Sequence, residues 1–292
     1  MSYVRRLAVL STTLGLTAAS LVTAASTSTA SVARGDGSGS AVNVFVAANH
    51  SIDIDSELRP GLHKFVVRSA GEAGFQLGMP APGYTKRELV RDIVAGLNQG
   101  KVRALKRFEA NMTLLGGVSS TADEQGTMWV NLQRGTYWAI DTMPGRPQAS
   151  EIETIRVSGE RLGARADAGT VIRAVGEVDW ARRPASMPAR GKVTFRNAST
   201  DNHFLGLTKL AKGKTMADFR EWIEGVAQGV EGPPPVNFNV GTETGVVSPG
   251  KSMTMRYSLP PGNYVMICFW PDADMGGMPH AFMGMYRGIR IG

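Results

Sequence analysis

The chain contains a weak copy of itself, and this repeat limits the folds that it can adopt. Residues 65–70 have the pattern of a strand that ends in a turn, and residues 193–198 show the same pattern 128 positions later. Residues 75–79 then match residues 203–207 at the same offset. Because these units keep their order, the sequence predicts two tandem copies of one domain.

Both copies continue with the same kinds of element. Thr85 with Glu88 and Thr215 with Asp218 have the spacing of a capping box, so an α-helix is expected after each threonine. Further strands are expected at 128–132, 137–141 and 154–157 in the first copy, and at 253–259, 264–268 and 288–291 in the second. Short alternating strands joined by Gly and Pro turns predict an all-β fold: two tandem Greek-key β-sandwiches, each with one inserted α-helix.

The first 30 residues differ in composition from the rest of the chain. Arg5 and Arg6 precede a mostly apolar run at 7–22, and small residues suited to cleavage follow. This pattern is typical of a secretory signal peptide and predicts a secreted, extracytoplasmic protein. No later apolar run is long enough to span a membrane, so no membrane-spanning segment is expected after the signal peptide is cleaved.

The repeat and the composition together give the expected domain boundaries. These are a signal peptide at 1–30, a flexible Gly/Ser-rich lead-in at 31–40, a first domain at 41–158, a linker at 159–169 and a second domain at 170–292. The formal net charge is +7, but Lys and Arg are scattered and not interleaved with aromatic residues, so nucleic-acid binding is not expected. Hydrolase, zinc-protease and P-loop motifs are absent from the sequence.

The only cysteine, Cys268, lies in the second copy. A single cysteine in an exported chain cannot form an internal disulfide, so its thiol is buried, paired between chains or used chemically. His203 precedes it, and His280 follows it within a methionine-rich tail: Met275, Met278, Met283 and Met285. Imidazole, thiolate and thioether together are ligands that suit copper. Taken singly, each residue also fits a structural role: Cys268 as a small buried apolar side chain, His203 at a strand edge and the methionines as core filling.

The run Pro-His-Ala-Phe-Met-Gly-Met at 279–285 resembles the C-terminal loop of the cupredoxins, the blue-copper β-sandwich family. The resemblance implies that His203, Cys268 and His280 bind one copper ion. It also implies Met285 as the axial ligand, because His-x4-Met is a spacing that this family uses, with Met283 as the alternative. Eleven residues separate Cys268 from His280, a longer loop than is usual in the family.

The chain also looks like uncharacterised secreted bacterial cupredoxin-like proteins, a resemblance that implies a fold and not a function. The matching runs are Cys268-Phe269-x-Pro271-Asp272 and Pro279-His280-x-x-x-Gly284-Met285.

The first copy provides a comparison within the chain. The alignment places Phe75 opposite His203 and Asp141 opposite Cys268, so the first domain is expected to be a cupredoxin-like shell without a metal site. The remaining two histidines, His50 and His63, are expected on the surface.

Three functions fit these expectations. The first is electron transfer to a redox protein partner through the edge of His280, which faces solvent in this family, with Trp270, Phe282 and Met283 as an apolar docking patch. The second is copper handling, in which the methionines receive Cu(I) from a copper donor. The third is a metal-free secreted binding or structural module.

An enzyme is not expected. Copper nitrite reductases and multicopper oxidases of this family add a second copper cluster built from several histidines, and this chain has four in total.

Overall fold

The computed structural model describes residues 40–143, 147–163, 169–181, 184–230 and 232–292. The expected signal peptide, the lead-in up to residue 39 and linker residues 164–168 lie outside these ranges.

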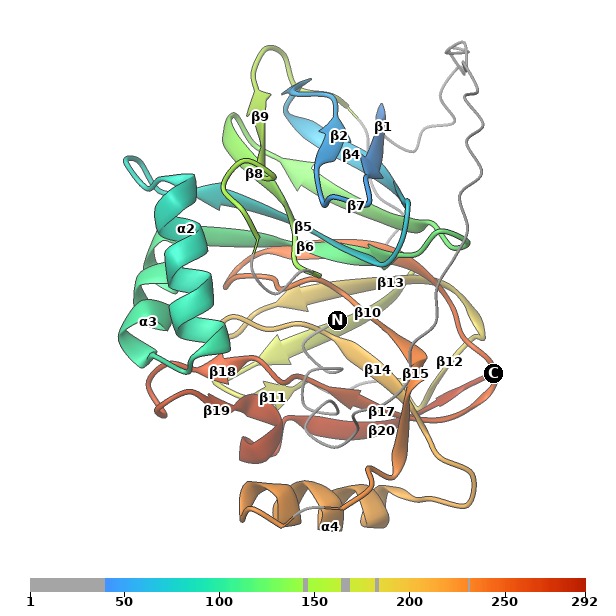
Figure 1. Cartoon of the computed structure of the whole chain (residues 1–292). Helices are drawn as coiled ribbons and strands as arrows, with labels where there is room; N and C mark the ends of the chain where they lie inside the picture. The colour runs from blue at the N-terminus through green and yellow to red at the C-terminus, as the bar shows by residue number, and fades with distance from the viewer. Residues whose placement is uncertain (1–39, 144–146, 164–168, 182–183, 231) are drawn as a thin grey trace, which may run out of the picture.

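Nine strands of the first half form two facing sheets (Figure 1). They are β1 (Ser40–Val46), β2 (Ile52–Ile54), β3 (Glu57–Leu58), β4 (Gly61–Ser69), β5 (Ala73–Pro80), β6 (Met112–Ser120), β7 (Gly126–Leu132), β8 (Gly135–Asp141) and β9 (Glu153–Val157). One sheet has the order β2-β1-β4-β7, and the other has the order β3-β9-β8-β5-β6. Strands β1 and β4 are parallel, as are β3 and β9, and the remaining pairs are antiparallel.

The second half repeats this topology strand for strand. Its strands are β10 (Thr170–Val175), β11 (Asp179–Trp180), β12 (Ser186–Met187), β13 (Arg190–Asn197), β14 (Gly206–Leu210), β15 (Val236–Glu243), β16 (Ser252–Ser258), β17 (Gly262–Ile267) and β20 (Tyr286–Ile291). The sheet orders are β11-β10-β13-β16 and β12-β20-β17-β14-β15, with the same two parallel pairs. The structure therefore confirms the all-β class and the two repeated β-sandwiches.

The second half has one addition between β17 and β20. The short strands β18 (Pro271–Asp272) and β19 (Met278–Pro279) form a hairpin, which the 3-10 helix η3 (His280–Met283) follows. This addition carries His280, so the candidate ligand belongs to an element with no counterpart among the described residues of the first half.

The same kind of hydrogen bond from a tyrosine hydroxyl occurs at the equivalent place in both sandwiches. The hydroxyl of Tyr137 donates to the carbonyl of Gln133, and the hydroxyl of Tyr264 donates to the carbonyl of Pro260. Each bond reaches back four residues, as in the tyrosine corner of Greek-key sandwiches. Both tyrosine side chains are almost fully buried, so each bond satisfies a hydroxyl in the core.

The two halves are joined within their sheets. Strand β7 pairs with β16, so the two four-stranded sheets form one continuous sheet of eight strands. The other layers also meet, because β6 hydrogen-bonds to residues 244–248 of the second half. Gln76 adds two side-chain bonds to the backbone of Val246. The buried apolar side chains accordingly form one cluster that spans both halves.

The inserted helices differ between the halves. In the second half, α4 (Met216–Ala227) is a single helix with a capping box formed by Thr215 and Asp218. In the first half, α2 (Lys86–Ile93) has the expected capping box, but it continues through a π-helical turn, η2 (Val94–Asn98), to another helix, α3 (Val102–Asn111). The first domain thus has a helix pair where the sequence predicts one helix. Among the described residues, none of the helices has the length and apolar character needed to cross a membrane.

Candidate metal centre

Three separate segments bring the predicted ligands together. His203 lies just before β14 and forms a two-way backbone bridge with Val247. Cys268 follows the last residue of β17, and its backbone N–H donates to the carbonyl of Met285. His280 begins η3, and its N–H donates to the carbonyl of Trp270. Backbone hydrogen bonds to neighbouring segments therefore fix the position of each ligand.

The donor atoms of these residues converge in the interior. The Nδ1 atoms of His203 and His280 each lie 3.7 Å from the Sγ atom of Cys268, and the two ring centroids are 4.6 Å apart. All three side chains have 0% exposure. Metal bonds of about 2.0 Å to nitrogen and about 2.3 Å to sulfur, set about 120° apart, separate nitrogen from sulfur by about 3.7 Å. The spacing therefore fits one metal ion held by two imidazoles and a thiolate.

Burial keeps the Cys268 thiol and the His203 imidazole neutral in the absence of a metal. It raises the pKa of the Cys268 thiol to about 12, against the opposing effect of the Phe204 backbone N–H, which donates to the sulfur. Burial, together with the neighbouring His280, lowers the pKa of His203 to about 3. A neutral imidazole has a free lone pair for a metal, whereas the thiol must lose its proton when it binds the ion.

The four methionines of the tail lie in different surroundings. Met285 is fully buried and pairs through its backbone with Cys268, whereas Met283 is half-buried in η3. Met275 and Met278 are 54% and 43% exposed, and they lie in the loop between Cys268 and His280. The complete burial of Met285 fits the expectation that this residue, and not Met283, is the axial ligand.

The outer nitrogen of His280 faces carboxylates. Its Nε2 atom lies 3.2 Å from Oδ2 of Asp201 and 4.0 Å from Oδ2 of Asp272. Neither aspartate was predicted from the sequence. The sequence offered one clue, since Asp201 lies only two residues before His203.

The expected solvent-facing edge of His280 is absent, and this prediction was wrong. His280 has 0% exposure and Trp270 has 3%, so neither forms part of a docking patch, while Phe282 and Met283 are half-buried. Asp201 and Asp272 lie at the outer nitrogen of His280, and Trp270 is covered by α3 of the first half, which runs beside the loop that carries β18 (Figure 1). Glu109 accepts a hydrogen bond of 2.7 Å from the indole N–H of Trp270.

Two further contacts hold α3 against this loop. The ring of Phe108 lies 6.1 Å from that of Trp270, and Lys106 pairs with Asp274 at 2.6 Å. Burial raises the pKa of Glu109 to about 7, although the Trp270 hydrogen bond acts in the opposite direction. The first half therefore forms one wall of the candidate centre in the second.

The first half has a different cluster at the equivalent place. The N–H of Gly74 donates to Asp141 Oδ1 at 2.8 Å, just as the N–H of Phe204 donates to Cys268 Sγ at 3.5 Å. This match shifts the sequence alignment by two residues, so Ala73, and not Phe75, occupies the place of His203. Asp141 is paired with His50 at 2.8 Å instead of with a metal ligand.

The predicted surface position of His63 was wrong. Its side chain lies in β4 with 1% exposure, and its Nε2 atom bonds to the carbonyl of Arg59 at 2.6 Å. Within the described ranges, both groups of side chains that are arranged to hold a metal lie in the second half, one at His203, Cys268 and His280 and the other at Asp201, Asp272 and His280.

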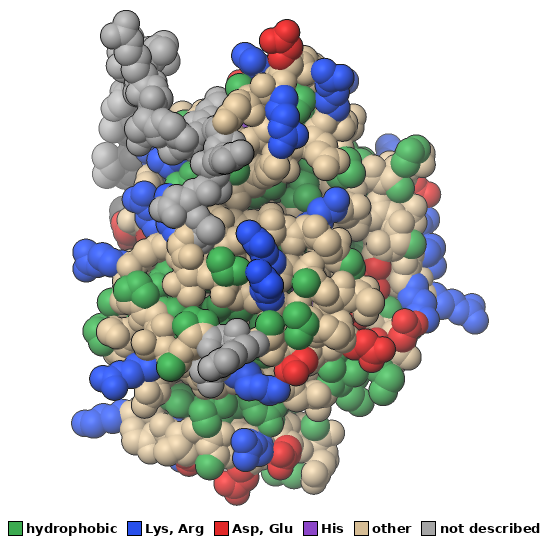
Figure 2. Space-filling model, turned by 180° about the vertical axis from the view of Figure 1, so that it is seen from behind, with side chains coloured by type: hydrophobic (Ala, Val, Ile, Leu, Met, Phe, Trp, Pro, Cys, Tyr) green, Lys and Arg blue, Asp and Glu red, His purple; other side chains and the backbone are tan. Residues whose placement is uncertain are grey.

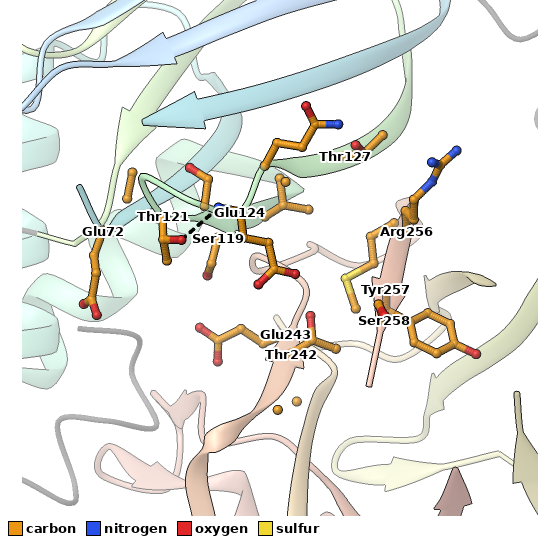
Figure 3. Close-up of a pocket in the computed structure, with 18 of the residues that line it drawn as sticks. Glu72, Ser119, Thr121, Glu124, Thr127, Thr242, Glu243, Arg256, Tyr257 and Ser258 are labelled. Carbon is orange, nitrogen blue, oxygen red and sulfur yellow. Dashed lines mark hydrogen bonds between the residues drawn. The ribbon is translucent and has the colours of Figure 1, made fainter. Parts of the chain in front are cut away.

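A groove of about 790 Å³ lies at the junction of the halves, apart from the candidate centre. Figure 3 shows Glu72 and Glu124 on one side, Glu243 below them and Arg256 on the other side. None of the predicted ligands lines this groove. Figure 2 shows Lys and Arg side chains spread over one face among apolar and acidic ones.

No protein-family model matches the chain, and no curated protein matches it. Among solved structures, auracyanin from the photosynthetic bacterium Roseiflexus castenholzii is 22% identical, over 44% of this chain and 99% of its own, with a TM-score of 0.28. Auracyanin A, a "blue" copper protein from Chloroflexus aurantiacus, is 14% identical over 43% of this chain and 98% of its own, with a TM-score of 0.27. A Cu-containing nitrite reductase from Thermus scotoductus SA-01 is 10% identical over 89% of this chain and 69% of its own, with a TM-score of 0.23.

Both halves have a cupredoxin-like fold, defined by their shared strand order. The identities to these solved structures are below 25% and the TM-scores are below 0.5. The case for copper in this chain therefore rests on its own residues.

Proposed function

We propose that the second half binds one copper ion and that the chain is a secreted carrier of single electrons, not an enzyme. His203 and His280 would hold the ion through Nδ1 and Cys268 through Sγ, with Met285 as the weak axial ligand. The observation that supports this most is the approach of both Nδ1 atoms to within 3.7 Å of one buried sulfur. Copper in such a ligand set supplies one-electron redox chemistry.

The residues around the candidate ligands do two things for this function. Backbone pairing to Val247, Met285 and Trp270 fixes the three ligands before any ion is bound, which limits their movement when the charge of the ion changes. Complete burial of the ligands excludes water, which strengthens electrostatic interactions in the centre.

The copper-binding proposal is tested with the full chain, with Cys268→Ser and, as a matched control, with His50→Ala in the first half. After loading with Cu(II), we expect an intense thiolate-to-copper charge-transfer band in the visible spectrum of the wild type and of His50→Ala. Cys268→Ser should lack the band. A wild-type protein that binds no copper and shows no band contradicts the proposal, and a metal-free module is then the better interpretation.

A second candidate function, the handling of Cu(I), is favoured by the exposure of Met275 and Met278 next to the centre. Thioethers are soft ligands that suit reduced copper. If these side chains receive the ion, the double variant Met275→Leu with Met278→Leu should slow loading from a Cu(I)–thiol complex while leaving the final spectrum unchanged. An unchanged loading rate removes this role.

A further inference from the structure

Each of the two segments that carry His203 and Cys268 also carries an aspartate directed at His280. Asp201 lies two residues before His203, and Asp272 lies four residues after Cys268. The imidazole of His280 is thus enclosed, with its Nδ1 atom facing Cys268 at 3.7 Å and its Nε2 atom facing Asp201 at 3.2 Å. Asp272 is farther from Nε2, at 4.0 Å, outside hydrogen-bond distance.

Asp201 is itself held in a fixed turn. Its Oδ1 atom accepts the backbone N–H of Asn202 at 2.6 Å, and its carbonyl accepts bonds from the side chains of Asn197 and Ser199. Asn197 also bonds to the carbonyl of Val247, the residue that pairs with His203. The turn therefore connects the Asp201 carboxylate to the backbone that positions another candidate ligand.

The contact between Asp201 and Nε2 of His280 determines which nitrogen of the imidazole carries the proton. A carboxylate has only acceptor atoms, so the nitrogen that faces it must donate. In a neutral imidazole only one nitrogen is protonated, and the other then has a free lone pair. Rotating the ring by half a turn would place carbon atoms where both nitrogens now have partners, and His280 has no exposed surface through which water could compensate.

We infer that Asp201 is the positioning residue of this centre: it accepts the Nε2 proton of His280 and so directs the Nδ1 lone pair of that ring toward Cys268 and His203. The role of this contact in metal binding rests on the proposed function, but the tautomer of His280 can be measured in the protein without metal. Among the described residues of the first half the equivalent place differs, because Asp141 occupies the position of the cysteine and is itself paired with His50.

The test reads the tautomer of His280 by long-range 1H–15N correlation in the full, metal-free chain labelled with 15N-histidine. The chain has four histidines, and His280→Gln assigns the signal. We expect His280 to be protonated at Nε2 in the wild type and in Asp201→Asn, whose amide oxygen still accepts. Asp201→Ala should show a mixture of tautomers, and Asp272→Asn, the control, should match the wild type. A wild-type His280 protonated at Nδ1, or an Asp201→Ala spectrum with an unchanged tautomer, overturns the inference.

Copper affinity provides a separate measurement. In competition with a chromophoric Cu(II) chelator, Asp201→Ala should bind copper about 10- to 100-fold more weakly than the wild type, and Asp201→Asn should recover most of the loss. An affinity of Asp201→Ala equal to that of the wild type overturns the positioning role. If the wild type binds no copper but has the expected tautomer, the proposed function fails while the positioning of His280 stands. A wild type that shows the charge-transfer band but is protonated at Nδ1 supports the proposed function and overturns the inference.

Discussion

Cys268 has no exposed surface, and its thiol lies against two imidazoles. Reaction with thiol reagents requires access and the thiolate form. Burial prevents access and raises the pKa of this thiol to about 12, so both requirements fail in the folded chain.

We therefore expect Cys268 in the metal-free protein to react with a disulfide reagent only when the chain unfolds. The rate of thiol release, measured against denaturant concentration, should follow the unfolding curve obtained by circular dichroism. Rapid reaction at pH 7 in the native state would show that the centre opens to solvent.

At the level of single residues, the sequence predicted that His203, Cys268 and His280 converge. The types and the order of these residues were sufficient to place them on the strands of a known fold. It did not predict Glu109, which lies 161 residues before its partner Trp270. A contact between separate halves of a fold leaves no local pattern in the sequence, and Glu109 by itself resembles any other polar residue of a helix.

The helix pair of the first half is held together by a buried carboxylate. Asp92 of α2 accepts bonds from Arg107 of α3 at 2.8 Å and from the hydroxyl of Tyr84 at 3.0 Å. Burial acts to raise the pKa of Asp92, but the bonds from Arg91 and Arg107 outweigh it, so the pKa is lowered from its ordinary value of 3.8.

A carboxyl whose pKa is lower in the folded state stabilises the fold above the unfolded-state pKa, and the effect is lost as the pH falls through the folded-state pKa. Asp92→Asn should therefore reduce the free energy of unfolding at pH 7 by about 1 to 3 kcal/mol. The difference from the wild type should shrink below about pH 4. Denaturant unfolding at pH 7 and at pH 3 measures the difference in stability between the variant and the wild type. A difference of the same size at both pH values contradicts an ionic role of Asp92.

Glu109 affects the pH dependence of stability in the opposite direction. Burial raises its pKa from the ordinary value of 4.5 to about 7, so its contribution to stability is fully present below 4.5 and is lost as the pH rises through 7. Glu109→Gln keeps an acceptor for Trp270 and removes the charge. Above pH 7 we expect this variant to be more stable than the wild type by up to about 3 kcal/mol, with equal stability near pH 4. Denaturant unfolding at pH 4 and pH 8 measures the difference, and Glu109→Ala is the control that also loses the hydrogen bond.

The sequence predicted α2 and α4 because both begin with a capping box. It did not predict α3, whose first flanking residue, Lys101, provides no side-chain cap. This helix is defined by packing instead, since Ala104, Leu105 and Phe108 turn a buried face to the protein. Local signals were absent, so only the folded chain reveals the second helix.

The whole molecule is organised by the sheet that passes through both sandwiches. The repeat predicted two similar units but not the pairing of β7 with β16, because both strands have the ordinary alternating pattern of a sandwich strand. Backbone bonds between β6 and residues 244–248 add a second connection between the layers.

Because sheet and core are shared, we expect the halves to unfold together. Tryptophan fluorescence and far-ultraviolet circular dichroism should give coincident denaturation curves. Residues 169–292 expressed alone should be unfolded or aggregated, since that piece would expose the edge of β16 and the apolar surface under it. Two separate transitions, or a folded isolated half, would show that the shared sheet contributes little.

The contact of α3 with the Trp270 loop also bears on the exchange of an ion with solvent. Every proposed donor is enclosed, so an ion could enter or leave only if part of its surroundings moved. The hydrogen bond between Glu109 and Trp270 would resist such a movement on the side of the first half. The first half would in that case slow the loading and release of an ion held in the second half.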